Sequence, residues 1–536
     1  MNDIEISRKS IKKPIIEIAS TIGLNQDDIS LYGDYKAKIT SKNDNENAKL
    51  ILVTAISPTP FGEGKTTVSI GLLDALRSLN RNAIVCLREP SQGPVFGLKG
   101  GAAGGGLSQV VPMEDINLHF TGDIHAITAA NNLISAAIDN HIYFGNNLDI
   151  QKVLFKRCLD VNDRALRRIK LENREESFNI TAASEIMALL CLASSLDDLK
   201  ERLGKIIIGI NSRGEFIYVK DLKLEGSLIV LLKDAFKPNL VQTLENNPAL
   251  IHGGPFANIA HGCSSLIATK TAMSLADYVI TEAGFGAELG AEKFFDIKCR
   301  VGNLNPYKVV LVSTIKALKY HGGCPIDKIY EENPIYLEKG FENLDKHYSN
   351  LLKFGVNVVV CLNLFATDTP EEIKLFEKHC MEKGYTYTTS NAYNLGSAGA
   401  LDLANKIIEE KESNFHYLYE LEDSLSEKIN KVCCGLYGAS KVNYSDIALE
   451  KIRVLETNEM TYLPICVAKT QYSFSDDKNK VGVPKDFEVT VKDIDIYLGA
   501  GFITVLLGDM VTMPGLPRVP NYEKIDLENG EIINLS

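Results

Sequence analysis

The sequence predicts an α/β fold whose main sheet is mostly parallel, and two observations lead to this prediction. Short runs of apolar and β-branched residues recur along the chain, at 50–56, 83–87, 205–210, 278–281, 309–313 and 356–362. Helical patterns such as 66–79, 180–203 and 371–383 lie between or after these runs. Strands that are apolar throughout and alternate with helices are typical of a parallel sheet covered by helices on both faces.

The overall composition narrows the classes of protein to which the chain can belong. Its 536 residues are 45% hydrophobic and 24% charged, with a formal net charge of −12. This acidic balance argues against nucleic acid or an anionic membrane surface as a partner. The N-terminal residues lack the apolar core of a signal peptide, no stretch reaches the ~18 apolar residues that span a bilayer, and the 11 cysteines include no CxxC pair. We therefore expect a cytoplasmic protein with reduced thiols.

A loop rich in Thr, Pro and Gly joins the first predicted strand to the following helix, in ILVTAISPTPFGEGKTTVSIGLL. Strand, Gly-rich loop, Lys-Thr and helix form the arrangement of a phosphate-binding loop (P-loop), whose backbone N–H groups and helix N-terminus surround phosphate oxygens. Lys65 is predicted to reach the outer phosphates of a nucleoside triphosphate, and the Thr66 hydroxyl to bind its Mg²⁺. The predicted nucleotide-binding residues are Thr59, Pro60, Phe61, Gly62, Glu63, Gly64, Lys65, Thr66 and Thr67.

The loop departs from the usual GxxxxGK[ST] pattern at one position. Thr59 stands where the first glycine is expected, so Gly62 and Gly64 are expected to supply the backbone freedom instead. The alternative interpretation is a Gly-rich turn that carries an exposed lysine. The full strand–loop–helix context favours phosphate binding.

A second polar group follows the next predicted strand, where Arg88 and Glu89 come directly after Leu87. Ligands of open α/β sheets bind beyond the carboxyl ends of the strands, so Arg88 is predicted to lie near Lys65. Its planar guanidinium suits a carboxylate or a phosphate, and an ion pair with Glu89 is the alternative. The glycine run GLKGGAAGGG, at 97–106, would let backbone approach a ligand closely. The acidic and histidine residues of MEDINLHFTGDIHAIT match no zinc spacing.

These segments, with several others in the same order, resemble one family. The matching motifs are PTPFGEGKTT, GLKGGAAGGG, MEDINLHFTGD, GGPFANIAHGC, TEAGFGAELGAEKFFDIKCR and LKYHGG, followed near the C-terminus by AKTQYSFSDD and MPGLPRVP. Together they are similar to formate–tetrahydrofolate ligases, almost from end to end. A glycine-rich loop alone would be weak support, whereas long motifs in a shared order are specific.

The resemblance implies an activity and roles for particular residues. The family joins formate to N10 of tetrahydrofolate with ATP, through formyl phosphate. It implies that Lys65 and Mg²⁺ neutralise the transferred phosphoryl group and that Arg88 holds formyl phosphate. Glu89 and Asp123 match acidic positions near the catalytic site and would neighbour a monovalent cation, K⁺ or ammonium. Phe285 matches a nucleotide-side contact, with core packing as the alternative, and the family is commonly a homotetramer.

The expected folate pocket departs from the family pattern. The two aromatic walls that would hold the pterin ring map to Phe365 and Tyr393, and the second wall is usually Trp. Leu107 stands where the glycine run usually ends in Tyr. Tyr393 still offers a stacking face of smaller area. Further departures are Ala366, Ser313, Lys316 and the segment 394–399.

Three functional hypotheses remain. The first is the family reaction; the second activates formate but passes the formyl group to a different amine, because the departures fall in the acceptor pocket. A nucleotide-dependent switch or scaffold is the third, but it leaves Arg88 and the acidic residues without a role.

We expect a nucleotide-binding region at 1–150 continued by 247–345, an inserted lobe at 151–246, and C-terminal lobes with the folate pocket at 346–536.

Overall fold

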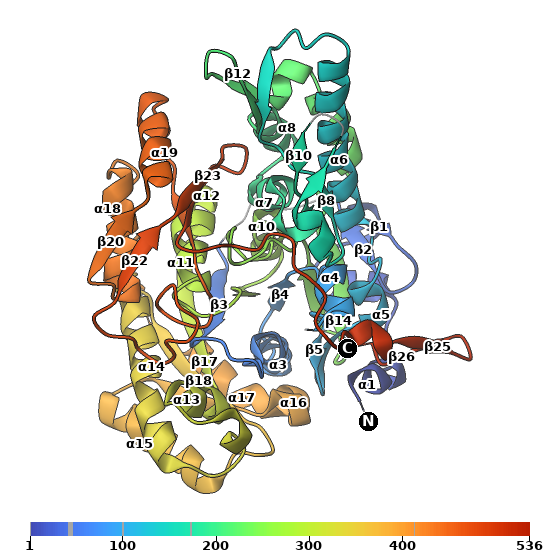
Figure 1. Ribbon diagram of the computed structural model, residues 1–536. Coiled ribbons are helices and arrows are strands. Elements are labelled where there is room, and N and C mark those ends of the chain that lie inside the picture. Colours follow the sequence, from blue (N-terminus) through green and yellow to red (C-terminus); the bar gives the residue numbers. More distant parts are fainter. Residues whose placement is uncertain (1, 41–46, 99–100, 172–173, 412, 536) are drawn as a thin grey trace.

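The computed structural model confirms a mixed α/β fold around one large sheet (Figure 1). It describes residues 2–40, 47–98, 101–171, 174–411 and 413–535, so two positions of the glycine run, 99 and 100, lie outside the described residues. The sheet has 12 strands, and the order along its main path is β1-β2-β14-β15-β4-β16-β3-β17-β18-β19.

The central part of this sheet is parallel, as the apolar strand patterns predict. Every neighbouring pair from β15 to β19 along the path is parallel. The order is non-sequential, so β16 lies between β4 and β3, which are close together in the sequence. The seven parallel strands are β15 (Pro248–Ile251), β4 (Ala83–Leu87), β16 (Tyr278–Glu282), β3 (Lys49–Ala55), β17 (Pro306–Ser313), β18 (Val358–Asn363) and β19 (Tyr387–Ser390).

Antiparallel strands extend the sheet beyond β15. The strand β14 (Asn239–Thr243) pairs with β15, with β2 (Ala37–Ile39) and with β6 (Ser108–Val111). The strands β1 (Ile29–Leu31) and β5 (Gly104–Gly105) pair with β2 and β6. The predicted sheet is therefore mainly, but not entirely, parallel.

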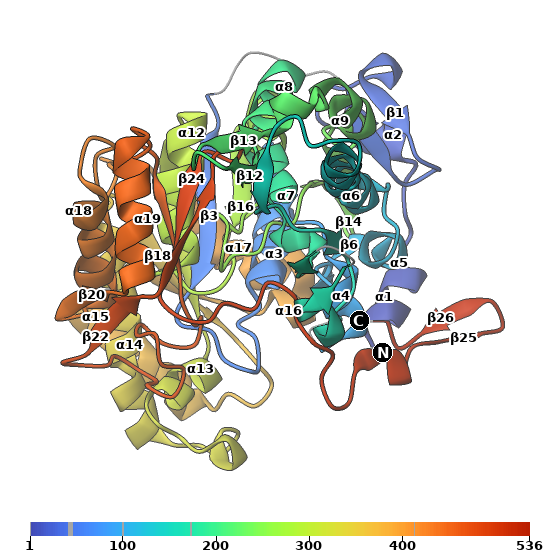
Figure 2. The same cartoon turned by 45° about the horizontal axis from the view of Figure 1, so that its top comes forward.

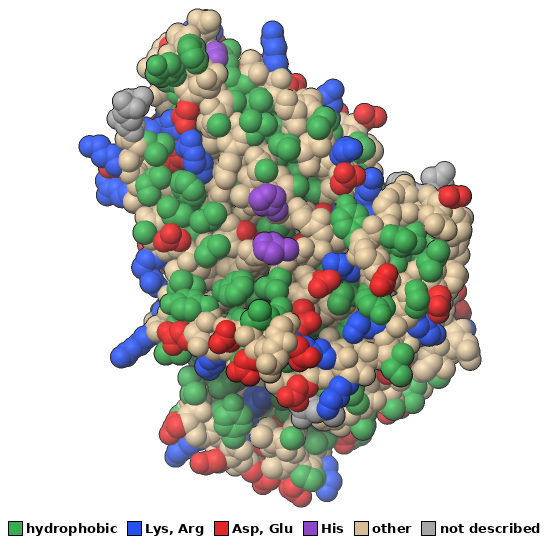
Figure 3. Space-filling view, turned by 90° about the vertical axis from the view of Figure 1, so that its right-hand side faces the viewer, with side chains coloured by type: hydrophobic (Ala, Val, Ile, Leu, Met, Phe, Trp, Pro, Cys, Tyr) green, Lys and Arg blue, Asp and Glu red, His purple; other side chains and the backbone are tan. Residues whose placement is uncertain are grey.

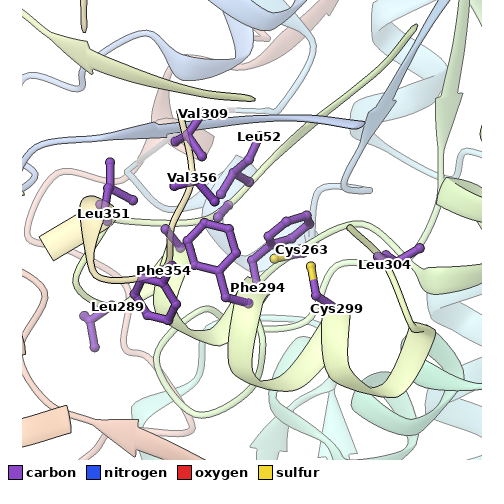
Figure 4. Packing of buried hydrophobic residues seen from close by; sticks show 14 of the residues in the cluster. Leu52, Cys263, Leu289, Phe294, Cys299, Leu304, Val309, Leu351, Phe354 and Val356 are labelled. Atoms are coloured by element: carbon purple, nitrogen blue, oxygen red, sulfur yellow. The ribbon is translucent and has the colours of Figure 1, made fainter. Parts of the chain in front are cut away.

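Helices bury both faces of the parallel strands. Alternate residues of β3 point to opposite sides: Leu50 and Leu52 belong to one core, Ile51 and Val53 to the other. The helices α3 (Lys65–Ser78) and α17 (Leu401–Ile408) cover one face. The other face packs against α10 (Leu266–Leu275), α14 (Pro334–Leu352) and the helical segment 290–302. In Figure 4, Phe294 of this segment lies near Leu52, and Cys299 lies beside Cys263. This two-sided burial explains why the strands are apolar throughout.

Residues 123–236, which lie between strands β6 and β14 in the sequence, form a lobe at the upper right of Figure 1. Its core lies among α6 (Asp123–Tyr143), α7 (Glu185–Leu192), α8 (Leu196–Gly204) and α9 (Glu225–Leu232). The prediction of a parallel strand at 205–210 was wrong. That segment forms β12 (Ile207–Asn211), which pairs antiparallel with β7 (Ile150–Val153) and β13 (Phe216–Tyr218), because a local apolar run does not specify its partners.

The helical pattern at 180–203 is interrupted rather than continuous. The helix α7 ends at Leu192, and Ser195 caps the start of α8 by accepting a hydrogen bond from the backbone N–H of Asp198. Serine competes for backbone hydrogen bonds in this way and favours helix starts over helix interiors. The apolar spacing alone could not locate this break.

The two ends of the chain lie side by side (Figure 2). The first helix, α1 (Asp3–Lys9), lies beside the hairpin of β25 (Asp526–Glu528) and β26 (Glu531–Ile533). Arg8 joins them by pairing with Glu531 (3.1 Å) and donates through Nε to Glu114 (2.9 Å). These contacts hold the N-terminal helix against the C-terminal hairpin and Glu114.

The surface carries charges of both signs. On the face shown in Figure 3, Lys and Arg side chains alternate with Asp and Glu side chains. Within the described parts of the chain, no helix combines the length and the apolar character that crossing a membrane would require.

Candidate active site

The strand order brings the predicted site residues to one edge of the sheet. Parallel strands have their carboxyl ends on the same side, and ligands of such sheets bind there. The predicted P-loop follows β3, Arg88 follows β4, and Glu282 ends β16, the strand between them. On the other side of β3, Phe365 follows β18 and Tyr393 follows β19.

The P-loop adopts a backbone conformation that needs its glycines. Gly62 and Gly64 have φ of +76° and +75°, in the left-handed region. Gly64 precedes α3, and a Cβ at this position would lie 2.3 Å from Asn363 Nδ2. That amide, at the end of β18, donates to the carbonyl oxygen of Glu63 (3.1 Å). Two glycines and a neighbouring strand therefore shape the loop although Thr59 replaces the usual first glycine.

The Glu63 side chain folds back into the loop. It accepts hydrogen bonds from the backbone N–H of Thr59 (2.7 Å) and from the Thr59 hydroxyl (3.1 Å). Its Oε2 lies 4.0 Å from Lys65 Nζ, and burial raises the pKa of Glu63 while Lys65 and these hydrogen bonds oppose the rise. The Lys65 side chain is 14% exposed. Its ammonium thus lies at the loop, with one carboxylate at the outer limit of an ion pair.

Glu282 connects the P-loop to Arg88, and the sequence reasoning missed it. The Thr66 hydroxyl donates to Glu282 Oε2 (2.8 Å), and Arg88 Nη2 lies 3.8 Å from Glu282 Oε1. Behind Arg88, a Cβ at Gly284 would lie 3.0 Å from Nη1. The sequence signal that could have identified Glu282 is an acidic residue at the end of an apolar strand, in TEAGFG. An acidic residue on a strand beside a P-loop Thr is the arrangement that holds Mg²⁺ in P-loop enzymes.

Glu89 and Asp123 are neighbouring acidic residues, and Asp123 is the one whose charge is neutralised by an ion pair. Asp123 Oδ1 pairs with Lys38 Nζ (2.8 Å), and its Oδ2 accepts from Asn239 (2.7 Å). Glu89 is buried, and its Oε2 has no hydrogen-bond partner among the described residues. Burial, with Asp123 and Asp160 nearby, raises the pKa of Glu89 well above its ordinary value. Glu89 is therefore the less neutralised of these two carboxylates.

Phe285 lies in the turn that follows β16. Its φ is +61°, an uncommon conformation for an aromatic residue. The turn packs against the end of β3, since the N–H of Ala287 donates to the carbonyl oxygen of Ala55 (2.8 Å). The Phe285 side chain is half-buried against the core. The turn thus borders the P-loop, and contact with a nucleotide stays a prediction.

Two of the predicted folate residues, Tyr393 and Leu107, lie together. The N–H of Leu107 donates to the carbonyl oxygen of Tyr393 (2.8 Å). The Tyr393 ring packs on Gly105 and Gly106, because a Cβ at either position would lie 3.0 Å or less from it. Its hydroxyl donates to Asp3 Oδ1 (3.3 Å), and that oxygen also accepts from the N–H of Gly106 (2.9 Å). The N-terminal helix therefore holds this aromatic ring.

Phe365 has a different set of neighbours. The Lys316 ammonium lies 3.6 Å from the centroid of the Phe365 ring and 5.7 Å from that of Tyr330. The ring of Tyr330 lies edge-on to Phe61 of the P-loop, with the centroids 6.0 Å apart. One face of Phe365 is thus covered by a cation, so a pterin ring would stack on its other face or displace Lys316.

Comparisons with known proteins match the whole chain. A family model described as formate–tetrahydrofolate ligase matches residues 1–536. A protein named formate–tetrahydrofolate ligase, from Campylobacter concisus (strain 13826), is 55% identical over 549 aligned positions that cover 100% of both chains. The motif resemblance therefore extends over the full length. The chain belongs to the formate–tetrahydrofolate ligase family of enzymes.

Proposed function

We propose that the protein uses ATP to join formate to N10 of tetrahydrofolate through formyl phosphate, giving 10-formyltetrahydrofolate, ADP and phosphate. One observation carries the proposal: the P-loop, Glu282 and Arg88 meet at the carboxyl ends of three neighbouring strands. Membership of the family supports formate and tetrahydrofolate as the substrates.

The first step transfers the γ-phosphoryl group of ATP. A formate oxygen bonds to the γ-phosphorus while the bond to the β–γ bridging oxygen breaks, and ADP leaves. Lys65 would neutralise the outer phosphates, and Arg88 would hold the formyl phosphate with its planar guanidinium. Thr66 and Glu282 present oxygen ligands of the kind that Mg²⁺ prefers, and they would hold the Mg²⁺ that accompanies the nucleotide.

The second step transfers the formyl group. N10 of tetrahydrofolate bonds to the formyl carbon, the carbon–oxygen bond to phosphate breaks, and N10 loses a proton. Phosphate is a good leaving group, so the step needs no covalent enzyme nucleophile. The protein has to orient the two reactants, and Phe365, Tyr393 and Leu107 would place the pterin ring.

A monovalent cation, K⁺ or ammonium, would bind beside Glu89. Its buried Oε2 has no hydrogen-bond partner among the described residues, whereas Asp123 is already paired with Lys38. A cation at Glu89 would favour the ionised carboxylate and offset its burial. Asp123 would then act as a neighbouring charge rather than as the main ligand.

A second candidate activates formate in the same way but formylates another amine. The position of Lys316 over Phe365 favours it, because this cation covers one of the two aromatic faces expected for the pterin. The smaller stacking area of Tyr393, compared with the usual Trp, also favours this second candidate. Family membership, in contrast, favours an enzyme over a nucleotide-dependent switch or scaffold.

The deciding experiment measures ADP release from ATP and Mg²⁺ in K⁺ buffer, with formate and tetrahydrofolate each present or omitted. Fast release only with both, accompanied by an equal amount of 10-formyltetrahydrofolate, is the expected result. Formate-dependent release that ignores tetrahydrofolate would point to another acceptor. Release that ignores formate and changes the oligomeric state would overturn both ligase proposals.

A further inference from the structure

Ser57, the residue at which the P-loop begins, is completely buried and bound through all of its polar groups. His321 at the end of α13 (Ile315–His321) donates through Nε2 to its carbonyl oxygen (2.9 Å). Asn343 of α14 accepts from its backbone N–H (3.4 Å) and donates to its hydroxyl (3.1 Å). His347, one helical turn later, lies 3.0 Å from the same hydroxyl. Two helices therefore hold the first residue of the loop.

The Ser57 hydroxyl lies between the side chains of Asn343 and His347. The Asn343 amide donates both to Ser57 Oγ and to the carbonyl oxygen of Gly482 (3.0 Å). His347 Nε2 lies within hydrogen-bond distance of the same hydroxyl (3.0 Å), and the tautomer of the ring sets which of the two atoms donates. His347 Nδ1 lies 3.7 Å from Glu288 Oε2, which is beyond hydrogen-bond distance. Burial lowers the pKa of His347 well below its ordinary value, so the ring is neutral.

Glu288 lies beside His347 and belongs to the turn that carries Phe285. It lies three residues after Phe285, in the turn that follows β16, and is completely buried. Its Oε1 lies 3.5 Å from Lys469 Nζ, and Lys469 also donates to the carbonyl oxygens of Thr470 and Ser473. Hydrogen bonds join the start of the P-loop to helix α14 and to Gly482, and the 3.7 Å contact between His347 and Glu288 brings this group against the Phe285 turn.

This network of contacts accounts for two motifs to which the proposed reaction assigns no role. His321 belongs to LKYHGG, and Lys469 and Phe474 belong to AKTQYSFSDD. The Phe474 ring packs on His347, with the ring centroids 4.7 Å apart. The N–H of Gly482 donates to His321 Nδ1 (3.3 Å), so the segment 469–482 contacts both histidines.

We propose that Ser57 and His347 are positioning residues that fix the P-loop relative to the turn carrying Phe285. This inference rests on the proposed function, because it takes the P-loop as the ATP site. Neither side chain reaches solvent, so they act through the loop and not on the substrate. Removing their contact should therefore weaken ATP binding while the KM for tetrahydrofolate stays unchanged.

The test compares ADP affinity and the KM values of matched variants of the full-length protein. Ser57→Ala removes the hydroxyl with little change in packing, and His347→Phe keeps a ring against Phe474 but removes its nitrogens. We expect each to raise the Kd for MgADP and the KM for ATP by about fivefold to tenfold, from the loss of one or two buried hydrogen bonds. His347→Gln, which can still bond Ser57, should restore most of the affinity.

The control lies on the same face of the same helix. Asn350 is buried on α14 and donates to the carbonyl oxygen of Leu436 (2.9 Å), away from the P-loop. Asn350→Ala should lower the melting temperature without changing the KM for ATP. If Ser57→Ala resembles Asn350→Ala in both measurements, the network is structural only and the inference is overturned.

A parallel variant separates this inference from the proposed function. Lys65→Ala should abolish formate-dependent ADP release and weaken MgADP binding. If a folded Lys65→Ala variant binds and turns over nucleotide normally, the P-loop is not the ATP site and the proposed function fails. If Lys65→Ala loses binding but Ser57→Ala and His347→Phe keep it, only the positioning role fails.

Discussion

Replacing Glu282 by Gln tests whether the carboxylate between the P-loop and Arg88 takes part in nucleotide binding. Glutamine keeps the shape and can still accept the hydrogen bond from Thr66 (2.8 Å), but it removes the charge that lies 3.8 Å from Arg88 Nη2. Glu282 is buried and Arg88 is 26% exposed, so solvent screens this pair incompletely. Hydrogen bonds to charged groups contribute roughly 1.5–3 kcal/mol and neutral ones roughly 0.5–1.5 kcal/mol, so losing the charge costs about 1–1.5 kcal/mol, or about 5- to 13-fold in the affected step.

The assay for Glu282→Gln is formate-dependent ADP release at increasing Mg²⁺, with ATP, formate and tetrahydrofolate saturating. We expect a lower kcat in the range above and a higher Mg²⁺ concentration at half-maximal rate, because one oxygen ligand loses its charge. Glu176→Gln is the control, since that buried carboxylate pairs with Arg157 and Arg174 in the separate lobe. It should lower the melting temperature only. An unchanged rate and Mg²⁺ dependence for Glu282→Gln would refute the reasoning.

Three further predictions follow from single side chains. Arg88→Ala should lower kcat by about 100-fold while the Kd for ATP changes little; a collapse in ATP affinity, measured by calorimetry, would place Arg88 in the nucleotide site instead. Tyr393→Trp should lower the Kd for tetrahydrofolate by about two- to tenfold through a larger stacking face, and an unchanged Kd would mean that this ring does not contact folate. Burial raises the pKa of Asp74 to about 8, although Thr243 and Asn247 donate to it. The folded state therefore favours protonated Asp74, and its contribution to stability is lost as the pH rises from about 4 to about 8. In urea unfolding over this range, the free energy of unfolding of the unmodified protein should fall by up to ~1.4 kcal/mol per pH unit relative to that of Asp74→Asn. A difference between the two proteins that does not change with pH would contradict the prediction.

Local sequence patterns were sufficient to predict several features of the fold and the candidate site. The strand at 50–56, the loop and the helix at 66–79 each have a strong local signature, and the structure places β3 and α3 within one residue of these bounds. The motif order was sufficient for the family, which the full-length match confirms. The roles of Lys65, Arg88 and the folate residues stay predictions, because they concern bound ligands.

The tertiary structure alone decided which segments are neighbours. Glu282 is 216 residues from Thr66 in the sequence, and it reaches the P-loop only because β16 inserts between β3 and β4. The apolar run at 205–210 has the same local character as the central strands but pairs in a different lobe. Likewise, Ser57 is held by side chains 264 to 290 residues away. Propensity and motif spacing are short-range properties, so they were sufficient for most local elements and for the family. Strand order and buried polar partners depend on long-range packing, so only the folded chain could reveal them.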